Sequence, residues 1–257
     1  MNLPELLATI DAEESNVPIS VPSTWLQGRT AYGGLSASLA HHQAKKTSDN
    51  MPPLRSAQIA YVGPLSGEVQ VETKLLRRGR NTAFVQSDIV GEQGLGLRCT
   101  FIFMASRNSK ISYHGKDGME LPPVPPSDDI RSGPEKFFTY HMEYPAKRLD
   151  LEQTSNRLSN WHRIKERDNL DPMTELLCIG DALPPSAMGL MTEAGPVSSM
   201  NWQVNLLTDT PTTNDGWWHL SSDTHHAENG ASSQYMTVRN TSGDPVMTGM
   251  QSVALFV

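Results

Sequence analysis

A pattern of glycine-marked turns between strand-like segments occurs twice in this chain. The turn glycines Gly79 and Gly230 lie 151 residues apart, and Gly94 and Gly243 lie 149 residues apart. In each half, a segment rich in small residues comes before the turns, and an apolar segment ends the copy. Because only the loop lengths drift between the copies, the sequence predicts two fused domains of one architecture.

The segments between the turns have the composition of β-strands, and each is bounded by turn residues. In the first half the expected strands are 56–62, 68–77, 82–91 and 96–104. In the second half they are 156–165, 198–207, 217–224, 232–240 and 246–257.

One helix is expected before the main strands of each half. In the first half, Leu35 and Leu39 recur at helical spacing among alanines. In the second half, Asp171 is a suitable N-cap, Pro172 suits the first helical position, and Pro184 with the proline after it ends the helix. The repeated order predicts an α+β fold with two tandem antiparallel sheets, each wrapped on a central helix and running together within one chain.

The middle of the chain separates the two copies. From position 121 it reads Leu-Pro-Pro-Val-Pro-Pro, a composition typical of an extended and fairly stiff connector. We therefore expect an N-terminal domain over 1–106, a linker or crossover over 107–150, and a C-terminal domain over 151–257.

The overall charge and hydropathy exclude several classes of protein. The net charge of −7 leaves no basic excess to bind nucleic acid. No apolar run reaches the roughly 18 residues of a membrane span, and the first residues do not resemble a signal peptide. The sequence therefore predicts a cytoplasmic protein without a membrane span.

The cysteines and histidines do not indicate a metal centre. Cys99 and Cys178 lie in apolar segments and are expected to be buried, reduced thiols. The histidines at 41–42 and 225–226 are adjacent pairs, and neighbouring side chains on a helix or strand diverge too much to chelate one ion. We expect no metal.

Several motifs, in this order and spacing, resemble the TesB-type acyl-CoA thioesterase II proteins, which have a double hot-dog fold. The resemblance covers most of the chain outside the central connector. It is carried by Gln27-Gly28, Tyr32-Gly33-Gly34, the strand 55–64, Leu76-Arg77-Arg78-Gly79-Arg80, Ile179-Gly180-Asp181-Ala182-Leu183-Pro184-Pro185 and Gly249-Met250-Gln251.

This resemblance implies hydrolysis of acyl-CoA to a free acid and CoA, without a cofactor. The family uses a helix aspartate, a hydroxyl residue at a strand start and a glutamine on the last strand, which together bind a water. The matching positions are Asp181, Ser199 and Gln251. Ser199 keeps the hydroxyl where relatives more often carry threonine.

The residues themselves support two of these positions. On a helix that starts at Pro172, Asp181 borders an apolar stripe, where a carboxylate needs partners. On the last strand, alternation places Gln251 on one face with Met247 and Val253, so its amide must find partners inside. The alternative for Gln251 is a surface amide on an edge strand.

Two further positions remain open between a functional and a structural interpretation. Alternation groups Ser199 with polar residues on a solvated face, where it would have no special role and Ser198 could face the helix instead. A bulge or the frayed start of the strand could still turn Ser199 inward. Gly33 and Gly34 either mark a helix entry where no side chain fits, or expose amides that hold a thioester carbonyl oxygen.

The expected mechanism is direct attack by water, with Asp181 as general base, Gln251 and Ser199 orienting the water, and an amide near Gly34 polarising the thioester. The sequence has no Gly-x-Ser-x-Gly motif for an acyl-serine route, and no histidine follows closely after Asp181 as in a hydratase pair. The alternative function is a non-catalytic acyl-CoA or acyl-chain binding protein.

Because fused hot-dogs leave sheet faces uncovered, we also expect a homodimer or larger assembly.

Overall fold

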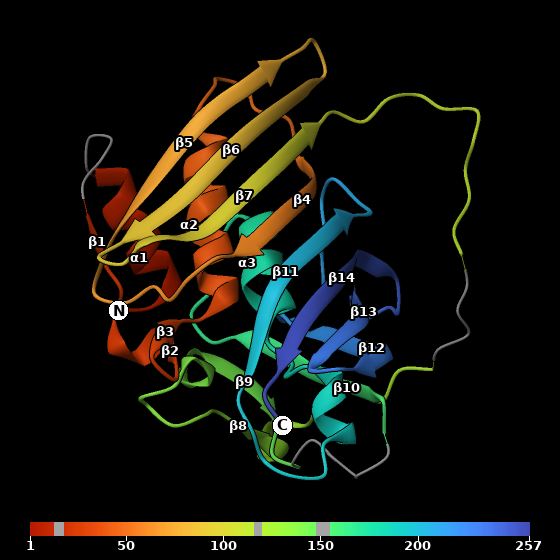
Figure 1. Ribbon diagram of the computed structural model, residues 1–257. Coiled ribbons are helices and arrows are strands. Elements are labelled where there is room, and N and C mark those ends of the chain that lie inside the picture. The colour runs from red at the N-terminus through yellow and green to blue at the C-terminus, as the bar shows by residue number, and fades with distance from the viewer. Residues whose placement is uncertain (13–17, 116–119, 148–154) are drawn as a thin grey trace.

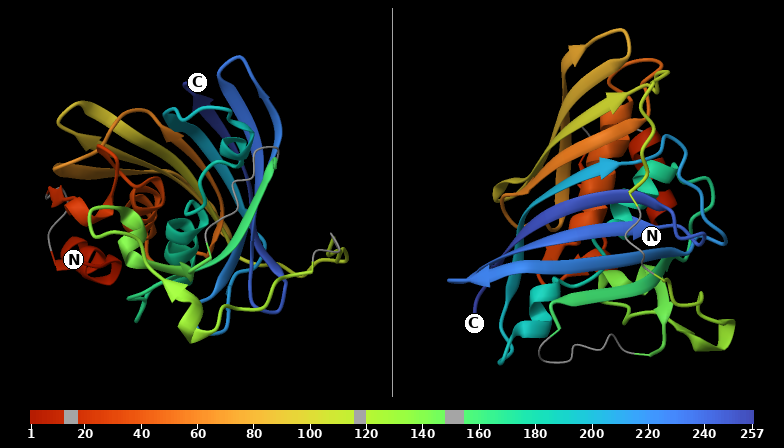
Figure 2. Two further views of the ribbon diagram at one scale, coloured as in Figure 1. Left: turned by 90° about the horizontal axis from the view of Figure 1, so that it is seen from below. Right: turned by 90° about the vertical axis from the view of Figure 1, so that its right-hand side faces the viewer.

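The computed structural model describes residues 1–12, 18–115, 120–147 and 155–257. In this part of the chain, one curved antiparallel sheet of 12 strands wraps around two central helices (Figures 1 and 2). The strands follow the order β1-β5-β6-β7-β4-β11-β14-β13-β12-β10-β9-β8.

The first half contains α1 (Leu3–Ala12), β1 (Ile19–Ser20), β2 (Leu26–Gln27), β3 (Thr30–Ala31), α2 (Gly33–Lys45), β4 (Leu54–Tyr61), β5 (Glu68–Arg78), β6 (Thr82–Gly91) and β7 (Gly94–Met104). The connecting segment contains β8 (Ile130–Arg131) and β9 (Met142–Pro145). The second half contains β10 (Arg157–Ile164), α3 (Pro172–Gly180), β11 (Val197–Leu206), β12 (Trp218–Glu228), β13 (Ala231–Arg239) and β14 (Pro245–Leu255).

The two halves have the same topology. In each half, the first strand after the helix lies at the junction, and the fourth, third and second strands follow outward, as β4-β7-β6-β5 and as β11-β14-β13-β12. The strand that precedes the helix in each half lies outside these four strands: β1 lies next to β5, and β10 lies next to β12. β4 and β11 pair antiparallel and join the halves into one sheet. The predicted α+β double hot-dog fold is confirmed.

Alternation and turn chemistry explain how the strands form. In β7, the side chains of Leu97, Cys99, Phe101 and Phe103 all point inward and are buried. The β12–β13 hairpin turns at positions 229 and 230, which both have positive φ, as a tight hairpin turn requires. Cys99 and Cys178 are both free and buried, as expected.

The central helices α2 and α3 pack directly against each other. A Cβ atom on Gly34 would lie 2.3 Å from the Cys178 carbonyl oxygen, so a larger side chain has no room there. Two hydroxyl groups also link the helices: Tyr32 Oη donates to the Cys178 carbonyl at 2.6 Å, and Ser38 Oγ donates to the Thr174 carbonyl at 2.9 Å. This close contact brings the beginning of α2 next to the end of α3.

The structure adds detail around the predicted linker. The segment 107–150 contains β8 and β9, which extend the sheet beyond β10. The predicted start of the C-terminal domain at 151 lies outside the described residues. Among the described helices, none has both the length and the apolar character needed to cross a membrane.

Candidate active site

Asp181 lies at the point where the two central helices meet. It is the residue directly after α3, rather than a residue within the helix as the sequence suggested. Its carboxylate accepts a hydrogen bond from the Gly34 backbone N–H in the first turn of α2. A Cβ atom on Gly33 would lie 2.6 Å from Asp181 Oδ2, so glycine at 33 allows the carboxylate to approach α2.

The environment of Asp181 makes it a weak acid with a pKa near neutrality. Burial raises the pKa of Asp181 from 3.8 to about 7, while the hydrogen bonds from Gln251 and Gly34 act in the opposite direction. The C-terminal end of α3 adds no stabilisation, because the helix dipole is negative there. A carboxylate with this pKa is well matched to accept a proton near neutral pH.

A chain of buried amides holds the carboxylate. Gln251 Nε2 donates to Asp181 Oδ1 at 3.0 Å, and Gln234 Nε2 donates to Gln251 Oε1 at 2.7 Å. Gln234 Oε1 in turn accepts from the Ser186 backbone N–H at 2.9 Å. Each amide is thereby fixed in one orientation, with the Nε2 of Gln251 toward Asp181.

Gln251 is buried on β14, between β11 and β13, so the alternative of a surface amide on an edge strand is wrong. Gln234 was missed in the sequence. It sits on the inward row of β13 with Met236 and Val238, and the alternation that singled out Gln251 also applies to it.

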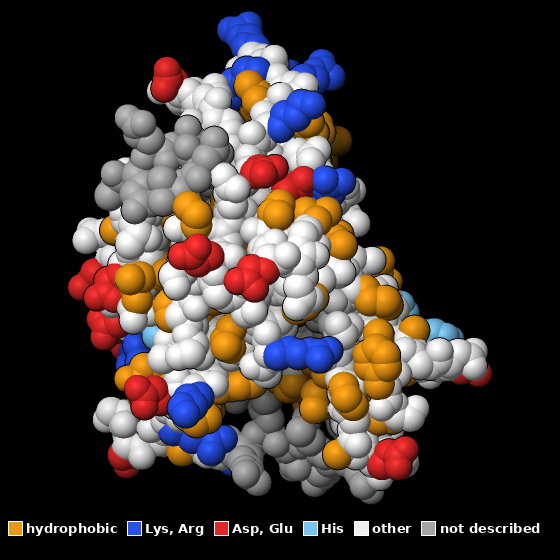
Figure 3. Space-filling model, turned by 60° about the vertical axis from the view of Figure 1, so that its left-hand side comes forward, with side chains coloured by type: hydrophobic (Ala, Val, Ile, Leu, Met, Phe, Trp, Pro, Cys, Tyr) orange, Lys and Arg blue, Asp and Glu red, His pale blue; other side chains and the backbone are white. Residues whose placement is uncertain are grey.

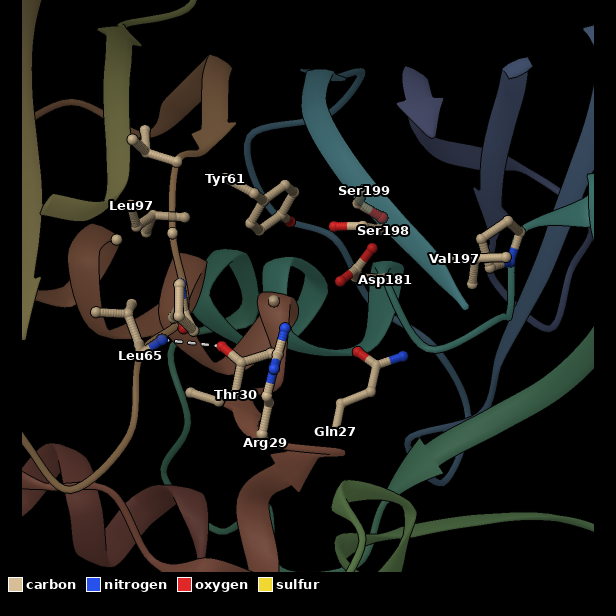
Figure 4. Close-up of a pocket in the computed structure, with 18 residues that line it drawn as sticks. Gln27, Arg29, Thr30, Tyr61, Leu65, Leu97, Asp181, Val197, Ser198 and Ser199 are labelled. Carbon is tan, nitrogen blue, oxygen red and sulfur yellow. Dashed lines mark hydrogen bonds between the residues drawn. The ribbon is translucent and has the colours of Figure 1, made fainter. Parts of the chain in front are cut away.

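A pocket of about 400 Å³ opens beside Asp181 (Figure 4). Both halves of the chain line it: the first half through β2, β3, the start of α2 and the end of β4, the second half through Asp181 and the start of β11. The Leu65 backbone N–H donates to Thr30 Oγ1 at 2.9 Å, which fixes one wall. Gln251 is not among the residues that line the pocket; it lies behind Asp181.

Both candidate serines line this pocket. The pairing of β11 with β14 shifts register between Ser199 and Asn201, which is the irregularity that the sequence analysis required for Ser199 to turn inward. Ser199 is half-buried and Ser198 is exposed. Figure 4 shows both side chains beside Asp181, and all three residues line the same pocket.

Tyr61 is a second residue that the sequence analysis missed. It ends β4, lines the pocket, and its hydroxyl is buried without a hydrogen-bond partner among the described residues. Burial and the nearby Asp181 raise the pKa of Tyr61 well above its usual value. Alternation along β4 places Tyr61 in one row with Ala57 and Ile59, which are buried; a hydroxyl in that row is the signal that was overlooked.

The expectation that an amide near Gly34 holds the carbonyl oxygen stays a prediction. The Gly34 N–H itself is directed at the Asp181 carboxylate and lowers its pKa. Gly33, one residue earlier, lines the pocket. Within the described ranges, no three His, Cys, Asp or Glu side chains gather closely enough to hold a metal ion.

The basic hairpin between β5 and β6 lies away from this pocket. The pocket borders the start of β5, near Leu65 and Gly96, whereas Arg77, Arg78 and Arg80 lie at the other end of that strand. Figure 3 shows lysine and arginine side chains gathered at this tip. The tip therefore does not form part of the pocket.

Two family models match the chain in succession. The acyl-CoA thioesterase N-terminal domain matches residues 21–107, and the acyl-CoA thioesterase C-terminal domain matches residues 119–255. No curated protein matches the chain.

Solved structures with the same fold cover nearly the whole chain. A hot dog fold protein of unknown function from Alicyclobacillus acidocaldarius has a TM-score of 0.79 at 16% identity, covering 95% of this chain and 94% of that one. The tesB protein of Mycobacterium avium subs paratuberculosis has a TM-score of 0.74 at 15% identity, covering 100% of both chains. An acyl-CoA thioesterase II, TesB2, from Mycobacterium marinum has a TM-score of 0.70 at 17% identity, covering 94% and 93%. Because the two family models follow each other in the expected order and the C-terminal model alone spans more than half of the sequence, the chain belongs to the acyl-CoA thioesterase family.

Proposed function

We propose that this protein hydrolyses acyl-CoA thioesters to a free acid and CoA by direct attack of water, with Asp181 as the general base. The observation that carries the proposal is the Asp181 carboxylate, which lines the pocket, has a pKa raised to about 7, and is held by neutral donors rather than by a cation. Such a carboxylate is basic enough to take a proton from water and remains ionised in part at neutral pH.

In this mechanism a water lies between Asp181 and a serine hydroxyl of β11. As the water oxygen bonds to the thioester carbon, its proton passes to Asp181. When the carbonyl re-forms, the carbon–sulfur bond breaks, and the CoA sulfur leaves with the electron pair and takes up the proton from Asp181. Gln251 keeps the carboxylate oriented from behind, and the Gly33 amide is a candidate donor to the carbonyl oxygen.

A panel of acyl-CoA substrates of increasing chain length, with release of free thiol as the readout, tests the proposal. We expect turnover on at least part of the panel, and a ranking by chain length would define the substrate. The Asp181→Asn variant is the matched control, because it keeps the size of the side chain and removes its basicity. Absence of turnover across the panel, together with measurable binding of acyl-CoA, would instead identify a non-catalytic acyl-CoA binding protein.

A further inference from the structure

The hydroxyl of Tyr61 is a buried polar group at the candidate active site. Its Oη is shielded from solvent and has no hydrogen bond among the described residues. A buried hydroxyl without a partner costs folding free energy, and such groups call for a functional explanation when they persist. Tyr61 and Asp181 both line the same pocket.

The backbone at Gly33 brings the Tyr61 ring and the carboxylate together. The position that a Cβ atom on Gly33 would take lies 2.9 Å from Tyr61 Cε1 and 2.6 Å from Asp181 Oδ2. The ring and the carboxylate therefore occupy the space beside this glycine from two sides. In Figure 4 the hydroxyl end of Tyr61 points from β4 toward Asp181 and the two serines.

Two donors beside the carboxylate are already engaged. Gln251 binds Asp181 Oδ1, and the Gly34 amide, the donor first expected for the carbonyl oxygen, binds the same carboxylate. A substrate carbonyl placed for attack by a water on Asp181 needs a donor on its other side. Tyr61 offers a neutral O–H that is buried beside the same space.

We propose that Tyr61 Oη donates a hydrogen bond to the thioester carbonyl oxygen and to the oxyanion that replaces it when water attacks. This role rests on the proposed function. As the carbon–oxygen bond to water forms, the carbonyl π electron pair moves onto its oxygen, and Tyr61 stabilises the charge while keeping its own proton. Burial beside Asp181 raises the pKa of Tyr61 well above 10, which suits a group that donates a hydrogen bond without giving up the proton.

Two non-hydrolysable CoA analogues of equal chain length test the contact without turnover. A ketone analogue replaces the thioester sulfur by CH₂ and keeps the carbonyl, whereas a thioether analogue replaces the carbonyl by CH₂. The loss of one hydrogen bond should reduce the preference for the ketone over the thioether by about threefold to tenfold in Tyr61→Phe relative to the parent. An unchanged preference in Tyr61→Phe would overturn the proposal, whether or not the protein hydrolyses acyl-CoA.

Turnover and stability provide two further readouts. Tyr61→Phe should lower kcat about 100-fold, with KM changed less than about twofold. Because the hydroxyl has no hydrogen-bond partner among the residues that the structure describes, the thermal midpoint of the variant should equal or exceed that of the parent. Parental kcat, or a lowered thermal midpoint that accounts for the loss of activity, would contradict the catalytic role.

Tyr235→Phe is the matched control. Tyr235 is exposed on β13, outside the pocket, with 55% of its surface accessible. This variant should keep the parental kcat and the parental preference between the two analogues. A loss as large as that of Tyr61→Phe would show that the effect is not specific to the pocket, and would overturn the assignment.

Discussion

The duplicated fold gives the pair of central helices two equivalent ends, and these ends differ in chemistry. At one end, Asp181 follows directly after α3 and lies beside the start of α2. At the other, α2 finishes beside Asp171, at the start of α3. There, Lys45 Nζ binds Asp171 Oδ2 at 2.8 Å. Among the described residues, Asp181 has no such cation, and its partners are an amide side chain and a backbone N–H.

The titration of the two carboxylates follows this difference in partners. Burial works to raise the pKa of Asp171, but His41 and the Lys45 ammonium outweigh it and hold that pKa below its usual value. Asp181 is buried beside neutral donors only, which do not offset the effect of burial, and its pKa rises to about 7. The same fold thus makes a structural ion pair at one end and a candidate base at the other, because only one end supplies a countercharge.

The largest effect is expected from removing the basicity of Asp181. Asp181→Asn should lower kcat by about 10²- to 10⁴-fold, the usual contribution of a positioned general base. Asp171→Asn, the equivalent change at the other end, should leave kcat close to the parental value. Steady-state assays with an acyl-CoA substrate measure both, and equal losses in the two variants would remove the distinction between the ends.

Asp181→Asn should also stabilise the fold at high pH. The pKa of Asp181 is about 7 in the fold against 3.8 as its ordinary value, so the neutral form is favoured by folding. This contribution is complete below pH 4 and is lost as pH rises through 7. The amide of Asp181→Asn does not ionise, so the variant avoids this loss. Its unfolding free energy relative to the parent should therefore be about 3 kcal/mol larger at pH 8 than at pH 4.5. Urea denaturation at both values checks this, and a gain independent of pH would count against a buried, titrating Asp181.

Gln251 is expected to have a smaller effect on turnover. Gln251→Ala should lower kcat by about tenfold, because Asp181 remains but is held less well. The hydrogen bond from Gln251 lowers the pKa of Asp181, so the variant should also shift the pH profile of kcat to higher pH. Its effect and that of Asp181→Asn should be less than additive in the double variant. Fully additive effects would show that the two residues act separately.

The smallest effect should come from the ion pair at the other end. Lys45 and Asp171 are 39% and 23% exposed, so solvent screens their attraction. Lys45→Met should lower the free energy of unfolding by about 1 kcal/mol or less, with kcat unchanged. Chemical denaturation together with a turnover assay checks both, and a large loss of activity would mean that this end also serves the site.

The sequence predicted most of the fold because its signals are local. Proline and aspartate mark the start of α3, the turn at Asn229 and Gly230 fixes a hairpin, and the alternation around Gln251 correctly placed it inside. The bulge that affects Ser199 was foreseen only as one of several alternatives, because a register shift depends on the pairing of β11 with β14.

Two features around Asp181 depend on contacts between the halves. Tyr61 lies on β4 and Asp181 follows α3, and nothing local indicates that they share a pocket. The bond from the Gly34 amide to Asp181 likewise requires the packing of α2 against α3, which the separate sequence patterns of the two helices do not contain. The sequence pointed to Asp181 and Gln251, and the structure added Tyr61 and Gln234.

The most direct test of the account is the pH dependence of kcat/KM for acyl-CoA hydrolysis between pH 5 and 9. The buried Asp181 predicts a rate that rises with pH through a single ionisation near 7 and then reaches a plateau. A rate that is flat over this range, or one governed by an ionisation near pH 4, would contradict a desolvated Asp181 as the catalytic base.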